Sequence, residues 1–232
     1  MSKIRRTSSI GDLSVARAKL VEDDASEESL SFRGHAAVFN QATLIGTVRW
    51  GFVEWIERGA FAPVLDDDVR LLINHDGVPL ARTTNNTLRL SEDKTGLVAE
   101  ADLAPVQLSR DLATLVERGD ITQMSFAFYP GEERVGTIDL GNRAKDSLPA
   151  GIPDEWDGLP FRAVTKMSRL FDVSPVTYPA YEGTDAEMVS EKIQAEIRSF
   201  LESNPGIRFE AKYSAQERAS RARANQIAWS KA

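Results

Sequence analysis

Residues 121–129 read ITQMSFAFY, and the rest of the chain is best interpreted outward from this stretch. Read with the two-residue period of a β-strand, Met124, Phe126 and Phe128 fall on one face. Ser125 falls on the other face, among small or amide side chains. A hydroxyl held there on a stiff strand leaves room for a substrate carbonyl to approach. The pattern also fits a polar residue on the wetter face of a half-buried strand, so a functional assignment needs partners for Ser125.

Segments with the same strand-like character recur along the chain, with turn residues between them. They lie near residues 32–39, 47–56, 69–73, 87–90, 96–103, 121–129, 134–140 and 161–173. Many short strands separated by turns are typical of all-β architectures. We therefore predict a mainly β fold with flanking helices, in which the strands form a closed or nearly closed antiparallel β-barrel.

Two helices are predicted beside these strands. Apolar residues recur at helical spacing over 106–116, and Gly119 provides a stop before the strand of Ser125. Near the C-terminus, Thr184 and Glu187 fit a capping box, and an apolar stripe follows at four-residue steps. This second helix is expected over 184–204, packing on the main domain or on a partner.

The distribution of charge and of large apolar residues predicts four parts. Residues 1–30 carry scattered charge and few large apolar groups, which indicates a flexible leader, although 13–21 could form a short strand. Residues 31–183 contain the predicted strands and form the main domain. The amphipathic helix over 184–204 follows, and residues 205–232 form a basic, mobile tail.

Composition excludes several classes of site. The chain has no cysteine, which rules out disulfides, a thiol nucleophile and a thiolate metal site. Its two histidines lack the spacing of zinc ligands and no glycine pattern suits a phosphate, so we expect neither metal nor cofactor. The net charge of -7 disfavours nucleic acid as a partner. No apolar run could span a bilayer and no signal-peptide core is present, so we expect a cytoplasmic protein without a membrane partner.

Either histidine could supply a base for Ser125, because histidine can accept and return a proton near neutral pH. His75 follows the apolar run 69–73 and lies at a strand end, where rigid scaffolds present catalytic groups. An Asn-His-Asp-Gly sequence is also a common surface turn. His35 alternates with small and apolar residues in 32–40, which fits a strand histidine better than a base.

A third group is needed to orient the base. Asp172 and Ser174 alternate with apolar residues in the segment 169–181, so the carboxylate belongs to one side of a strand. A strand-edge aspartate that caps a turn has the same pattern. The rival carboxylates are Asp76, Glu100 and Asp102.

Five segments, taken in order, resemble a known family. They are FRGHAAVFN (32–40), ERGAF (57–61), LINHD (72–76), GDITQMSFAF (119–128) and VSPVTYPAY (173–181). This order is similar to that of the prohead maturation proteases of tailed bacteriophages, the HK97-type serine peptidases, which are related in fold to herpesvirus assemblins. The resemblance implies that Ser125 is the nucleophile, His75 the general base and Asp172 the third member. The second histidine of the herpesvirus enzymes has no counterpart, because no histidine follows His75.

The resemblance also implies a role and a setting. Enzymes of this family remove scaffolding segments from the major capsid protein inside the assembling procapsid, in the host cytoplasm, and often cut themselves. We therefore expect an endopeptidase that cleaves capsid and scaffold protein through an acyl-enzyme. The oligomeric state is left open, with a homodimer as one option. The alternative is a non-catalytic capsid-assembly or scaffold-binding module on the same fold. An unrelated esterase is a weaker option, since no Gly-x-Ser-x-Gly elbow surrounds Ser125.

Overall fold

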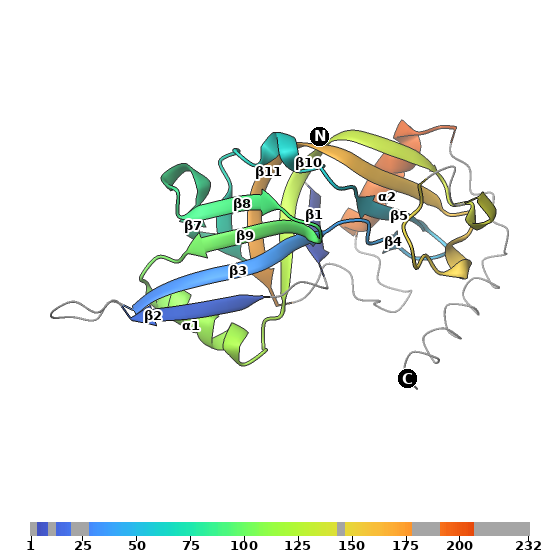
Figure 1. The fold of residues 1–232 in the computed structure, drawn as a ribbon. Coiled ribbons are helices and arrows are strands. Elements are labelled where there is room, and N and C mark those ends of the chain that lie inside the picture. The colour runs from blue at the N-terminus through green and yellow to red at the C-terminus, as the bar shows by residue number, and fades with distance from the viewer. Residues whose placement is uncertain (1–3, 9–12, 20–27, 143–146, 178–190, 207–232) are drawn as a thin grey trace. The chain divides into compact units, whose positions relative to one another are not determined.

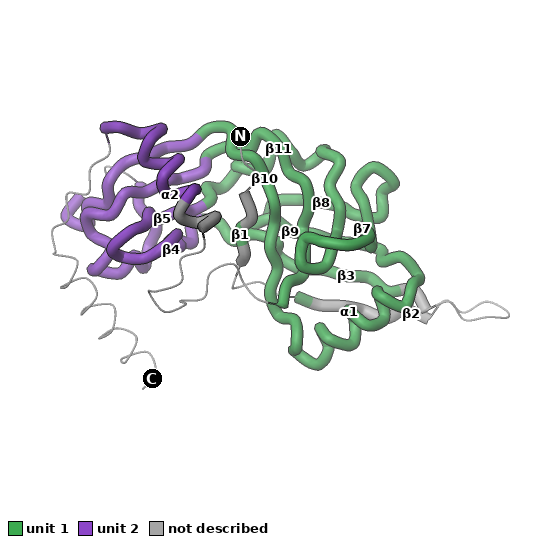
Figure 2. The backbone as a smooth tube through the Cα atoms, turned by 180° about the vertical axis from the view of Figure 1, so that it is seen from behind, with its two compact units in different colours: residues 1–39, 56–132, 165–182 green, residues 40–55, 133–164, 183–232 purple. Residues whose placement is uncertain are grey.

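Two compact units make up the chain (Figure 2). The computed structural model describes residues 4–8, 13–19, 28–142, 147–177 and 191–206. The first unit comprises residues 1–39, 56–132 and 165–182, and the second comprises 40–55, 133–164 and 183–232. Nearly all of the predicted basic tail lies outside the described residues, and the predicted division into leader, domain, helix and tail stays a prediction.

Most of the strands drawn in Figure 1 belong to the first unit. Its elements are β1 (Ile4–Ser8), β2 (Ser14–Lys19), β3 (Glu28–Val38), β6 (Arg70–Ile73), β7 (Asp76–Arg82), β8 (Leu88–Glu92), β9 (Gly96–Asp102) and α1 (Gln107–Glu117). The second unit holds β4 (Thr43–Gly46), nearly all of β5 (Gly51–Ile56) and α2 (Glu191–Ser203). The long strands β10 (Gln123–Thr137) and β11 (Pro160–Val176) contribute residues to both units.

The strands form two open sheets, so the predicted closed or nearly closed barrel is wrong. In a seven-stranded sheet, β1, β10, β11, β5 and β4 are neighbours in that order, while β6 pairs with both β11 and β7. A four-stranded sheet has the order β2, β3, β9, β8. Among the described residues, the end strands of each sheet do not pair with one another. The prediction of a mainly β fold with helices is correct.

The barrel prediction failed for a physical reason. A two-residue period shows which side chains share a face, but it does not show whether the last strand of a sheet pairs with the first. Two of the predicted strands, 121–129 and 134–140, overlap the single long strand β10. The segment 161–173 is likewise part of the longer strand β11. Two of the predicted segments thus merge into one longer strand, and that strand carries Ser125.

The core of the first unit follows from the alternation in 121–129. The rings of Phe126 and Phe128 have centroids 5.2 Å apart, and Phe61 packs edge-on against Phe126 at 5.3 Å. Such aromatic pairs stabilise a core beyond the area that they bury. The opposite face of β10 is buried too, because Ser125 is only 1 % exposed. Ser125 is therefore not a polar residue on a wet strand face.

The N-terminal residues form more regular structure than their composition indicated. β2 lies within the segment 13–21 that could form a strand, and it pairs antiparallel with β3. β1 pairs antiparallel with β10. Short segments with few apolar side chains can still become strands when their backbone N–H and C=O groups find partners in a sheet.

Both predicted helices have counterparts in the structure. α1 confirms the helix expected over 106–116, and it buries Leu112 and Ala113. α2 corresponds to the described part of the helix expected over 184–204, whereas the predicted capping box lies outside the described residues. Phe200 of α2 stacks on Phe52 with ring centroids 4.4 Å apart, so the apolar side of α2 packs within the second unit.

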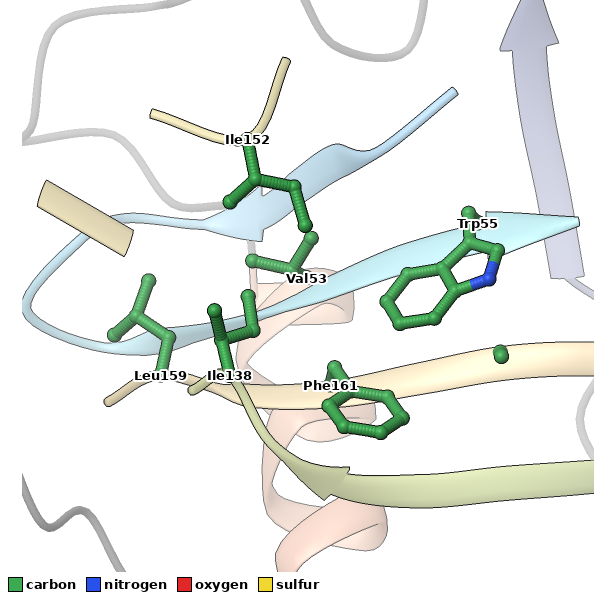
Figure 3. Close-up of a cluster of buried hydrophobic side chains, with 7 residues drawn as sticks. Val53, Trp55, Ile138, Ile152, Leu159 and Phe161 are labelled. Carbon is green, nitrogen blue, oxygen red and sulfur yellow. The ribbon is translucent and has the colours of Figure 1, made fainter. Parts of the chain in front are cut away.

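The second unit has an apolar core of its own (Figure 3). Trp55 of β5 and Phe161 of β11 pack with ring centroids 4.9 Å apart. The other buried members of this cluster are Val53, Ile138, Ile152, Leu159 and Ala163. The three candidate side chains, by contrast, all belong to the first unit.

Candidate active site

Ser125 occupies a buried position in β10. Its Oγ lies 2.6 Å from His75 Nε2. It also lies 2.7 Å from the carbonyl oxygen of Arg6 in β1, so the hydroxyl proton has two acceptors within hydrogen-bond distance. A buried hydroxyl with polar neighbours on two sides is held within narrow limits, as a nucleophile has to be.

His75 lies at the tip of the β6–β7 hairpin, in a two-residue turn with Asn74. Ile73 pairs with Asp76 across this turn, and Asn74 and His75 have φ angles of 53° and 61°. Positive φ at both central residues is the mark of a type I′ turn, for which Asn-Gly is the preferred sequence. A non-glycine residue in this left-handed region costs about 1–2 kcal/mol. The fold thus keeps His75 where glycine would be more stable, which points to a role for its side chain.

The turn is fastened to the end of β11. Asn74 N–H donates to the Pro175 carbonyl at 3.0 Å. The side-chain amide of Asn74 donates to Thr177 Oγ1 at 3.1 Å, and its Oδ1 accepts from Thr177 N–H at 2.9 Å. β6 also pairs in parallel with β11. These contacts bring the hairpin tip to the strand of Asp172, although 97 residues separate His75 from Asp172.

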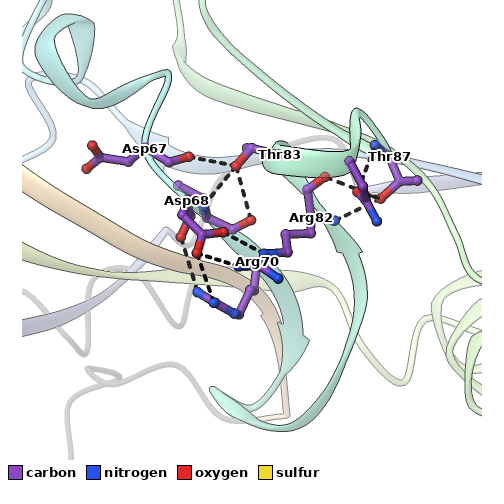
Figure 4. Close-up of polar contacts among 8 residues, drawn as sticks. Asp67, Asp68, Arg70, Arg82, Thr83 and Thr87 are labelled. Atoms are coloured by element: carbon purple, nitrogen blue, oxygen red, sulfur yellow. Dashed lines mark hydrogen bonds and ion pairs between the residues drawn. The ribbon is translucent and has the colours of Figure 1, made fainter.

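A polar cluster fixes the other end of the same hairpin (Figure 4). Asp68 accepts two hydrogen bonds of 2.6 Å from Arg82 and one of 3.0 Å from Arg70. The hydrogen bond from Arg82, together with the charges of both arginines, lowers the pKa of Asp68 to about 2. Thr83 Oγ1 donates to the Asp67 carbonyl at 2.6 Å. Because both of its ends are held, the hairpin is a rigid support for the residue at its tip.

Asp172 lies on β11 and is 2 % exposed. Its Oδ1 lies 2.5 Å from His75 Nδ1, and it accepts a hydrogen bond of 3.0 Å from Ser174 Oγ. An ionised carboxylate can only accept, so His75 Nδ1 carries the proton of the contact between them. In the neutral imidazole, Nε2 then has a lone pair directed at Ser125, which is the tautomer that a general base requires.

His35, the other histidine, is paired elsewhere. Its Nε2 lies 3.0 Å from Asp93 Oδ2, in the turn between β8 and β9. Burial favours the neutral form of Asp93, but hydrogen bonds from Gly96 N–H, His35 and Thr95 N–H outweigh it and lower the pKa of Asp93 to about 2. His35 is therefore a strand histidine with a carboxylate partner, as its sequence pattern indicated.

The three rival carboxylates also have partners of their own. These are Gly77 N–H for Asp76, Arg33 for Glu100 and Arg89 for Asp102. The hydrogen bond from Arg89 lowers the pKa of Asp102. Among the described residues, Asp172 is the carboxylate in hydrogen-bond contact with His75.

The side chains of Asp172, His75 and Ser125 thus form one continuous line of hydrogen bonds. Such a line can pass the serine proton to the imidazole while the carboxylate stabilises the positive charge that develops there. The chemistry that it supports is nucleophilic attack by a serine hydroxyl on an acyl carbon.

Comparison with protein families identifies the family of the chain. The family model of the caudovirus prohead serine protease matches residues 16–198, well over half of the 232-residue chain. The chain belongs to this family. The resemblance inferred from five sequence segments is therefore confirmed, and the prohead protease is a serine peptidase of phage capsid maturation. No curated protein and no solved structure matches this chain.

Two residues of the prohead protease's candidate site were missed in the sequence. Asn74 had a usable signal, because an asparagine between two strand segments separated by two residues is typical of a type I′ turn. Arg6 had none, since it contacts Ser125 through a backbone carbonyl, which every residue possesses. β1 also lies outside the range 16–198 that the family model covers.

Two findings concern other kinds of site in the prohead protease. Within the described ranges, no group of three or more histidine, cysteine or acidic side chains could hold a metal ion. None of the helices in the described part of the chain is both long and apolar enough to cross a membrane.

Proposed function

We propose that this prohead protease removes the scaffolding segment from the major capsid protein inside the assembling procapsid, and cuts its own chain, through an acyl-enzyme on Ser125. The observation that carries the proposal is the line of hydrogen bonds from Asp172 through His75 to Ser125, with contacts of 2.5 Å and 2.6 Å. Family membership supplies the reaction class and the procapsid setting.

In the first half of the proposed reaction, Ser125 Oγ attacks the scissile carbonyl carbon while its proton moves to His75 Nε2. The C–N bond then breaks, and His75 gives the proton to the leaving amine. In the second half, water attacks the acyl carbon and passes a proton to His75. The ester C–O bond breaks, and Ser125 recovers its proton.

Asp172 acts through His75 in this scheme. Its carboxylate holds Nδ1–H and balances the charge of the imidazolium that forms in each half of the reaction. Because Asp172 is 2 % exposed, water screens this attraction little. The hydrogen bond from Ser174 Oγ at 3.0 Å keeps the carboxylate in its orientation.

Replacement of Ser125 by alanine tests the proposal. The Ser125→Ala variant, co-expressed with the capsid and scaffold proteins, should yield shells whose capsid protein keeps its full length. Ser168→Ala is a matched control, because Ser168 lies on β11 and its hydroxyl is within hydrogen-bond distance of the carbonyls of Tyr129 and Pro130, away from His75. The wild-type chain and this control should both yield shortened capsid protein, seen by gel electrophoresis and intact mass. Normal shortening by Ser125→Ala would contradict the proposal.

A serine-directed fluorophosphonate separates a peptidase from a non-catalytic capsid-binding module. A peptidase should acquire the mass of the probe at Ser125 during prolonged incubation, because the imidazole raises the nucleophilicity of that hydroxyl. His75→Ala should prevent the labelling. A module that only binds scaffold would stay unlabelled while still entering the shells.

A further inference from the structure

The N-terminal strand β1 lies against the strand that carries Ser125 (Figure 1). Residues 4–8 pair antiparallel with residues 124–128, which puts Thr7 opposite Ser125. The carbonyl oxygen of Arg6 accepts a hydrogen bond of 2.7 Å from Ser125 Oγ. An extended segment of the chain itself therefore contacts the hydroxyl that we propose as the nucleophile.

We propose that β1 occupies the path of the peptide substrate and keeps the active site closed to other peptides until it leaves. The inference rests on the function proposed above. An extended peptide binds a sheet edge through backbone hydrogen bonds, and a peptidase needs one carbonyl of that peptide at its hydroxyl. β10 has β11 on one side and β1 on the other, so a peptide that pairs with β10 has to replace β1.

The contact between β1 and Ser125 blocks the hydroxyl, but it does not have the geometry of a substrate about to react. Attack requires Oγ to face the carbonyl carbon, with the carbonyl oxygen turned toward other donors. Here the carbonyl oxygen of Arg6 is itself an acceptor for the serine proton. A hydroxyl has one proton, so the carbonyl oxygen of Arg6 competes with His75 Nε2 for it. With β1 in place, the base therefore has a rival acceptor for the serine proton.

The side chain of Arg6 adds to the docking of β1. It is buried, with only 6 % of the residue exposed, although arginine is mostly exposed in folded proteins. An arginine in such a position contributes through the packing of its long stem as well as through its charge. β1 therefore has an anchoring side chain beside the carbonyl that meets Ser125.

Covalent connection explains how so short a strand could exclude other peptides. β1 has five residues, and a single short strand added to a sheet edge binds weakly. Its tether to β2 is short, however, and a short tether gives an effective concentration in the millimolar range. Dilute peptides would lose this competition. Scaffold and capsid chains packed inside a procapsid would compete at high local concentration, so access would open in the compartment where cutting is needed.

The experiment removes β1 from the protein after the chain has folded. A recognition site for an unrelated protease is inserted between Ser8 and Ser14, and the folded chain is cut there and passed over a sizing column. Fluorophosphonate labelling of Ser125, followed by intact mass, should be at least about tenfold faster after the cut, because the open state no longer has to compete with β1. The uncut insertion variant is the control. A synthetic peptide of residues 1–10 at millimolar concentration should restore the slow rate, and the same residues in scrambled order should not.

The outcomes distinguish this inference from the proposed function. Labelling of Ser125 that is equal or slower after the cut would overturn the inference and leave the function intact. If neither chain were labelled and both behaved as Ser125→Ala, the proposed function would fall. Circular dichroism and thermal denaturation follow the fold. A cut chain that unfolds would show that β1 is needed for the fold, and would overturn its role as a removable occupant.

Discussion

His75 Nε2 lies 2.6 Å from Ser125 Oγ, although 50 residues separate them in the chain. The contact depends on a two-residue turn in which His75 has a φ of 61°. This turn depends on Asn74, whose side chain hydrogen-bonds to Thr177 at the end of β11. Reactivity at Ser125 should therefore be sensitive to backbone conformation and to contacts that do not touch the hydroxyl.

Replacing His75 by glycine or by alanine should abolish labelling of Ser125 in both variants, because both lack the imidazole. The two variants should differ in stability. Glycine adopts a positive φ without strain. The free energy of unfolding of His75→Gly should therefore be about 1 kcal/mol higher than that of His75→Ala. Urea unfolding of both variants measures this difference. Equal stabilities would show that the turn relaxes and that the position is not strained.

Replacing Asn74 by glycine should slow labelling severalfold while leaving His75 and Asp172 unchanged. Glycine keeps the positive φ but removes both side-chain hydrogen bonds to Thr177, each worth about 1 kcal/mol. Asn74→Asp is the conservative control, because it keeps the oxygen that accepts from Thr177 N–H and tolerates the same backbone conformation. Recovery of most of the labelling rate in Asn74→Asp would support a positioning role. Equal rates for wild type and Asn74→Gly would exclude that role.

Replacing Asp172 by asparagine should lower the labelling rate roughly 10³–10⁴-fold, because an amide can present a donor to Nδ1 and favour the wrong tautomer of His75. Asp93→Asn is the matched control, since Asp93 contacts the other histidine, His35, at 3.0 Å. This control should label at the wild-type rate. A similar loss of rate in both variants would indicate a general structural effect instead of a role for Asp172.

The Asp68 cluster should make the stability of the protein depend on pH in the acid range. The pKa of Asp68 is lowered from 3.8 to about 2 by its hydrogen bond from Arg82, so the folded state binds this proton less readily than the unfolded state. The stabilisation is thus present above the ordinary pKa of 3.8 and is lost as the pH falls toward about 2. Asp68→Asn should be less stable than wild type at neutral pH, and the difference should shrink over that window. A pH-independent difference between their thermal unfolding curves would argue against the ion pair.

Part of the candidate site could be predicted because its signals are local. Ser125 interrupts an apolar alternation, and His75 follows an apolar run at a strand end. Asp172 and Ser174 share one side of a strand. The structure brings Ser125, His75 and Asp172 into hydrogen-bond contact. The occupancy of the Ser125 edge by β1 could not be predicted, because it depends on backbone pairing over a separation of 119 residues.

The sequence by itself determined the strand-rich composition of the fold, the helix α1, the family and the identities of three candidate residues. These follow from residue type and short-range periodicity, which can be read directly from neighbouring positions. Only the tertiary structure decided that the sheets are open, that a left-handed turn presents His75 to Ser125, and that β1 lies beside β10. These features depend on hydrogen bonds between backbone groups far apart in the chain. Because nearly every residue carries the same N–H and C=O groups, residue type alone does not specify which strands will meet.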